Sequence, residues 1–94
     1  MLQVSASPSF NRVAKKLHAR DKKVLDAAIK AVLVNPQIGE EKKGDLARVF
    51  VYKFKLNSQE TLLAYELLPS KSSATEVMLL AVGPHENFYA GLKR

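Results

Sequence analysis

The chain of 94 residues contains no cysteine and only two histidines, His18 and His85. Without cysteine, a disulfide framework, a thiolate metal site and a cysteine nucleophile are all excluded. Two histidines are too few for a convincing zinc site, so no metal and no other cofactor is expected.

Long apolar runs and a targeting signal are also missing. No stretch approaches the roughly 20 apolar residues that a helix needs to span a bilayer. The opening residues, MLQVSASPSF, lack the charged start and apolar run of a signal peptide. The sequence therefore predicts a cytoplasmic protein with no membrane partner.

Positive charge is what the chain has in excess. It has 15 Lys or Arg against 9 Asp or Glu, a formal net charge of +6. Residues 1–35 hold seven Lys or Arg against two Asp, a net of +5, whereas residues 36–94 have a net of only +1. Such asymmetry favours an anionic partner, either nucleic acid or an acidic protein segment. The alternative is an ordinary solvated helix surface.

The first helix is predicted after a short strand at residues 2–5. Ser7 or Ser9 is a plausible N-cap, and Pro8 is favoured near a helix start. Apolar residues then recur at helical spacing over residues 10–17.

The second helix is predicted after a break at residues 18–21, with Asp21 as its cap. An apolar stripe follows, and the helix should end at Asn35-Pro36 because the residue before proline disfavours the helical conformation. A short turn between the two helices makes them antiparallel neighbours.

After a polar loop at residues 37–46, the pattern changes to strands joined by short turns. Consecutive, closely linked strands favour an antiparallel meander. Residues 85–94 are expected to form a short helix or tail. The prediction is one α+β domain, residues 1–94, of order β-α-α-β-β-β, with a two-helix hairpin packed on a mainly antiparallel twisted sheet. The expected strands span residues 48–56, 61–68 and 76–83.

The first of these strands contains two lysines, Lys53 and Lys55. Because side chains alternate along a strand, both lysines share a face with Val49 and Val51, and Phe50 and its partners lie on the other. Strand lysines are commonly just solvent-facing residues of a half-covered sheet. The alternative is that the pair serves a phosphate or a carboxylate.

Three passages give the chain a resemblance to a known family. They are KKGDLARVFVYKFKL at residues 42–56, TLLAYEL at residues 61–67 and LLAVGPHENFYAGLKR at residues 79–94. Together with the order of elements, they resemble the RelE/ParE superfamily, the toxins of bacterial type II toxin–antitoxin modules. The resemblance implies growth inhibition that a cognate antitoxin neutralises in a toxin–antitoxin hetero-oligomer.

The superfamily contains at least two mechanisms on one fold, so the fold alone does not decide the activity. RelE-like members cleave mRNA on the ribosome without a metal, and ParE-like members inhibit DNA gyrase without nuclease residues. By resemblance to the RNase members, Lys53 and Lys55 would stabilise charge, His85 would act as acid or base, and Tyr89 would position the substrate. Their third strand typically has an arginine where this chain has Leu62, a departure that favours the gyrase alternative.

Basic residues outside that strand are the expected contacts to nucleic acid or to an antitoxin. The helices would offer them to ribosomal RNA, because phosphate contacts dominate such affinities, or to an acidic antitoxin tail that folds on binding. By strict alternation Arg48 lies on the face opposite to Lys53. The expected contact residues are Arg12, Lys15, Lys16, Lys22, Lys23, Arg48, Lys93 and Arg94.

Overall fold

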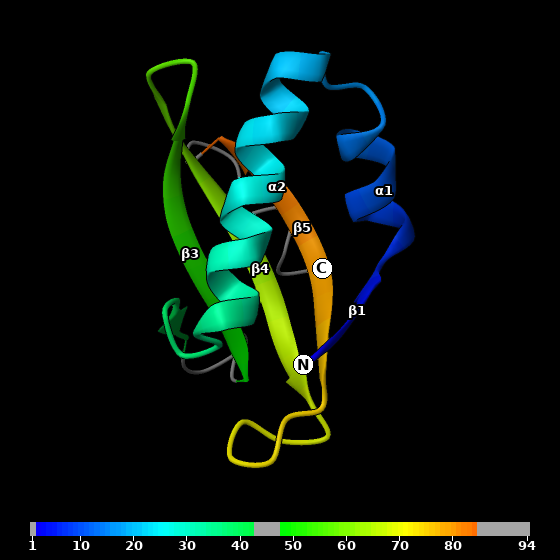
Figure 1. Cartoon of the computed structure of the whole chain (residues 1–94), viewed down its shortest axis with the longest axis vertical. Coiled ribbons are helices and arrows are strands. Elements are labelled where there is room, and N and C mark those ends of the chain that lie inside the picture. The colour runs from blue at the N-terminus through cyan, green and yellow to red at the C-terminus, as the bar shows by residue number, and fades with distance from the viewer. Residues whose placement is uncertain (1, 43–47, 85–94) are drawn as a thin grey trace.

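A computed structural model describes residues 2–42 and 48–84 of the chain. The predicted α+β architecture is confirmed: two helices pack on one side of a five-stranded sheet of order β1-β5-β4-β3-β2. Figure 1 shows the longer helix lying across the sheet and the shorter helix beside it. The strand β1 (Gln3–Ala6) runs parallel to β5, and every other neighbouring pair is antiparallel.

The helix α1 spans Pro8–Ala14 and begins as the sequence predicts. Ser7 is the N-cap, and its hydroxyl oxygen accepts a hydrogen bond from the backbone N–H of Phe10 at 3.1 Å. The same hydroxyl donates to the carbonyl oxygen of Leu80 at 2.7 Å, so the cap also ties the helix to β5. Leu17 lies beyond the end of this helix, although the apolar pattern had extended the helix that far.

The helix α2 spans Ala19–Val34 and presents Leu25, Ala28 and Val32 to the core. It begins earlier than predicted, because His18 takes the N-cap position and Asp21 lies within the first turn. Its end before Asn35-Pro36 agrees with the prediction.

The core of the molecule lies between the helices and the sheet. Alternation along β3 (Val49–Leu56), β4 (Gln59–Leu68) and β5 (Glu76–Pro84) turns apolar side chains toward the helices. On β3, Phe50 lies on the face opposite to the lysines, as predicted. A register shift beside Ala64 and Tyr65 lets both Leu79 and Val82 face this core. The buried members are Phe10, Leu25, Ala28, Val32, Phe50, Leu63, Tyr65, Leu67, Val77, Leu79 and Val82.

Two local features differ from the expected boundaries. The hairpin between β3 and β4 turns on Asn57 and Ser58 alone, both with positive φ, 54° and 64°, so β4 starts two residues before the expected strand. The polar loop also contains a short strand, β2 (Glu40–Glu41), which pairs with Val51 and Phe50. The expected helix or tail at residues 85–94 lies outside the described residues.

Candidate functional site

The side of the sheet turned away from α1 and α2, here called the lysine face, holds the predicted lysine pair. Lys53 and Lys55 both point to it and are exposed, as alternation along β3 requires. Lys53 pairs across the ladder with Leu62, and Lys55 pairs with Glu60. Neither lysine forms a hydrogen bond or an ion pair with any described residue, so both ammonium groups are available to an anion.

An apolar cluster lies beside the lysines on the same face. It is built from Val51, Leu62 and Ala64, all buried, with Leu80 and Ala81 packed against them. Leu62 is 0% exposed and lies in the ladder between Lys53 and Gly83. Leu62 stands where the sequence resemblance associates an arginine with the RNase members. In this sheet that position is apolar and buried.

Glu40 is a neighbour of the lysine pair that sequence reasoning missed. The strand β2 pairs Glu40 with Val51, and paired residues share a face, so its carboxylate lies on the lysine face. Lys42 hydrogen-bonds it at 3.1 Å. That hydrogen bond and the charge of Lys42, with a smaller contribution from Lys53, hold the pKa of Glu40 below its usual value. A two-residue strand in a polar loop has no periodicity by which the sequence could reveal it.

This arrangement can bind an anion and supports proton transfer less well. Two uncommitted ammonium groups stabilise negative charge that develops on a bound phosphate. Glu40 is ionised at neutral pH, but a lowered pKa makes a carboxylate a weaker base. Glu60, opposite Lys55, is an exposed second carboxylate on this face.

The other predicted site residues that the structure describes do not gather around the lysine pair. The basic residues of the helices are exposed on the other side of the molecule. Arg48 lies on the helix-bearing side, where it borders a pocket with Phe50 and Leu67, as strict alternation predicts. The helix residues are Arg12, Lys15, Lys16, Lys22 and Lys23.

Four predicted residues lie outside the described residues: His85, Tyr89, Lys93 and Arg94. Within residues 2–42 and 48–84, no three His, Asp or Glu side chains are grouped so as to hold a metal ion. None of the helices in this part of the chain is long and apolar enough to cross a membrane.

Comparison with solved structures finds the same fold in bacterial toxins. A mutant of the E. coli toxin RelE in the free state has a TM-score of 0.71 at 20% identity, covering 98% of this chain and 92% of that chain. The E. coli RelBE toxin–antitoxin complex gives 0.69 at 21% identity, with 92% and 99% covered. A toxin–antitoxin complex from Mycobacterium tuberculosis gives 0.70 at 21% identity, with 89% and 98% covered.

At the level of sequence, a search of the curated proteins finds no significant relative. The family model for the ParE-like toxin of type II bacterial toxin–antitoxin systems, however, matches residues 4–93. This match covers nearly the whole chain, including both helices, β2 to β5 and all of β1 except its first residue. The chain therefore belongs to the ParE-like toxins of type II bacterial toxin–antitoxin systems.

Proposed function

We propose that this toxin cleaves ribosome-bound mRNA without a metal, at the lysine face of its sheet. The observation that supports the proposal is the pair Lys53 and Lys55, exposed side by side and without a described ion-pair partner. Residues two apart on a strand lie about 7 Å from each other, so both ammonium groups can reach one phosphodiester and its neighbour.

Metal-independent RNA cleavage uses the 2′-hydroxyl as the nucleophile. It needs a base for that hydroxyl, a proton source for the leaving 5′-oxygen, and positive charge for the pentacoordinate transition state. Lys53 and Lys55 supply the positive charge in this proposal. His85 is proposed as the acid or base and Tyr89 as the residue that positions the substrate, on the strength of the motif in which they stand.

The proposal is tested with the variant Lys53→Ala/Lys55→Ala. Its matched control is Arg20→Ala/Lys30→Ala, which removes two exposed charges from α2. Because each lost electrostatic stabiliser typically costs about 100-fold or more in rate, the lysine variant should lose mRNA cleavage and growth inhibition while the control keeps both. Circular dichroism checks that each variant is folded. Full toxicity in a folded Lys53→Ala/Lys55→Ala protein would sink the proposal.

The second candidate is non-enzymatic inhibition of DNA gyrase. Leu62 favours it, because a buried leucine beside Lys53 leaves no guanidinium in the ladder to clamp a phosphate. Radiolabelled precursors separate the two mechanisms within minutes of induction. Loss of incorporation into protein supports mRNA cleavage, and loss of incorporation into DNA, together with inhibited supercoiling by purified gyrase, supports the alternative.

We further propose that a cognate antitoxin contacts the basic helices. A groove of about 390 Å³ between α1 and α2 has an apolar floor that includes Phe10 and Leu25. Its charged lining residues are Lys15, Lys22 and Asp26, a net charge of +1. Such a groove suits an acidic amphipathic segment that folds on binding. Two of the structures similar in fold are toxin–antitoxin complexes. A small acidic or DNA-binding protein encoded beside this gene would identify the partner.

A further inference from the structure

A second pocket lies on the helix-bearing side of the sheet, away from the lysine face. It has a volume of about 370 Å³, at the lower end of the range for small-molecule sites. Its walls come from the start of β3, from β2 and from the connection between β4 and β5. We call it the Arg48 pocket, and it is lined by Glu41, Arg48, Phe50, Leu67, Ser70, Lys71 and Ser72.

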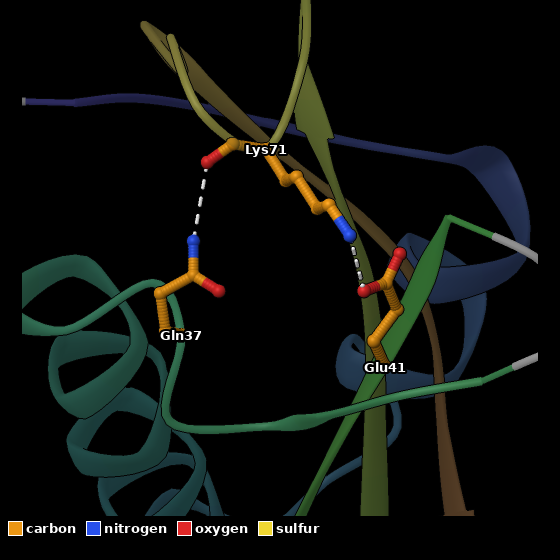
Figure 2. A network of polar contacts seen from close by, with 3 residues as sticks. All are labelled: Gln37, Glu41 and Lys71. Carbon is orange, nitrogen blue, oxygen red and sulfur yellow. Dashed lines mark hydrogen bonds and ion pairs between the residues drawn. The ribbon is translucent and has the colours of Figure 1, made fainter.

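Polar contacts between distant segments hold one wall of this pocket in place. Figure 2 shows Lys71 between two partners: its ammonium group contacts Glu41 at 2.8 Å, and its carbonyl oxygen accepts a hydrogen bond from Gln37 at 3.1 Å. An exposed ion pair contributes little to stability. The contacts therefore matter mainly because they position the β4–β5 connection over β2.

The charges in the Arg48 pocket do not balance. The carboxylate of Glu41 forms an ion pair with Lys71. No described residue forms a hydrogen bond or an ion pair with Arg48, which lines the same pocket. The guanidinium of Arg48 is therefore unpaired among the described residues, and those that line the pocket have a net charge of +1. Arg48 also has a positive φ of 77°, which is uncommon outside glycine. A guanidinium presents parallel N–H donors that match the two oxygens of a carboxylate or a phosphate.

The rest of the lining supplies hydroxyl donors and an apolar floor. The oxygen of Ser70 accepts a hydrogen bond from the backbone N–H of Ser73 at 3.2 Å, which leaves its hydroxyl proton for another acceptor. The hydroxyls of Ser70 and Ser72 form a hydrogen bond of 3.4 Å in which either can be the donor, so one hydroxyl proton of the pair remains for a ligand. Phe50 and Leu67, both nearly buried, close the bottom.

We propose that the Arg48 pocket binds a small organic monoanion, a carboxylate or a phosphate diester with an apolar body. Arg48 takes the anionic group, the serine pair donates its free hydroxyl proton to a remaining oxygen, and the apolar body lies against Phe50 and Leu67. The net charge of +1 favours one negative charge on the ligand. The site uses none of the residues assigned to RNA cleavage. A test of ligand binding is therefore independent of the test of the toxin mechanism.

The test is a titration of the isotope-labelled full chain, followed by amide chemical shifts in NMR spectra. The probes are phenylacetate and methyl phenyl phosphate, which are both monoanions at neutral pH, and the uncharged benzyl alcohol. At least one anion should shift the amides of Phe50, Leu67 and Ser70 saturably, with a dissociation constant of about 1 mM, as expected for about ten non-hydrogen atoms. Benzyl alcohol should bind at least about tenfold more weakly. The stronger of the two anions identifies the carboxylate or the phosphate as the preferred group.

Arg48→Asn removes the guanidinium and keeps a residue that tolerates positive φ, so the backbone can stay as it is. It should weaken anion binding about tenfold or more, whereas Lys30→Gln, a loss of one exposed charge on α2, should leave it unchanged. Ser72→Ala serves as the second variant and should weaken binding in the same direction. The proposal is overturned by absence of saturation up to about 10 mM, or by equal binding in Arg48→Asn and the wild type.

Discussion

Removing the hydroxyl of Tyr65 should destabilise this protein more than the loss of one oxygen atom suggests. Tyr65 is 0% exposed and stacks on Phe50, with ring centroids 5.4 Å apart. Its hydroxyl donates to the carbonyl oxygen of Pro36 at 2.7 Å and accepts from the backbone N–H of Gly39 at 3.0 Å. One side chain of β4 thereby satisfies two backbone groups of the segment that leaves α2.

The variant Tyr65→Phe keeps the ring and deletes both hydrogen bonds. A polar group left without a partner costs about 1–3 kcal/mol, and Pro36 and Gly39 are only half-buried residues, so a loss of about 2 kcal/mol in unfolding free energy is expected. In a domain of this size that corresponds to a fall of roughly 8–16 °C in melting temperature. Urea denaturation followed by circular dichroism measures the difference.

The matched control is Tyr52→Phe, on the neighbouring strand. No described residue hydrogen-bonds the Tyr52 hydroxyl, so its removal should change the unfolding free energy by no more than about 0.5 kcal/mol. An equal loss in Tyr52→Phe and Tyr65→Phe would refute the reasoning, because the effect would then not come from the Pro36 and Gly39 contacts.

Alkaline pH gives an independent measurement of the same site. Burial raises the pKa of Tyr65, and the hydrogen bond from Gly39 offsets this only in part. The folded state therefore binds the phenolic proton more tightly than the unfolded chain does. That stabilisation is complete below the ordinary tyrosine pKa of about 10 and is lost as the pH rises through the higher pKa of the folded state. The stability difference between wild type and Tyr65→Phe should shrink above about pH 10.

Two further substitutions test contacts that connect the helices to the sheet. A Cβ atom on Gly39 would lie 2.7 Å from the Tyr65 hydroxyl oxygen and 3.1 Å from the carbonyl carbon of Val51, so Gly39→Ala should destabilise the fold by about 1–3 kcal/mol. Chemical denaturation measures the loss of unfolding free energy in each single variant and in Gly39→Ala/Tyr65→Phe. The loss in the double variant should differ from the sum of the two single losses, and a loss equal to that sum would contradict a direct clash. Asp21→Ala removes a buried carboxylate from the first turn of α2, together with its 3.2 Å hydrogen bond from the Asn57 amide, and should cost about 1–2 kcal/mol. Asp26→Ala, an exposed position on the same helix, is the comparison, and thermal melts showing equal losses would remove any special role for Asp21.

The architecture was predictable because local patterns determine it. Helical spacing of apolar residues, the Ser7 cap and the Asn35-Pro36 stop located both helices, although α1 is shorter and α2 longer than predicted. Alternation along residues 49–56 assigned each side chain of β3 to the correct face, since a period of two leaves only one choice once the core side is known.

The elements that prediction missed depend on pairing between segments that are distant in sequence. The strand β2 exists because Glu40 and Glu41 meet Val51 and Phe50, and two polar residues have no strand signal of their own. The early start of β4 depends on a two-residue turn in which Asn57 and Ser58 both adopt positive φ.

For the candidate site, the sequence alone determined that Lys53 and Lys55 share one face of a strand, because alternation is a property of the backbone. Only the tertiary structure decided which face that is, how deeply Leu62 is buried beside the pair, and that Glu40 lies next to it. It also placed Arg48 with Lys71 and two serines on the other side of the same sheet. The physical reason is that burial, pairing and charge proximity depend on contacts between segments that local sequence patterns do not encode.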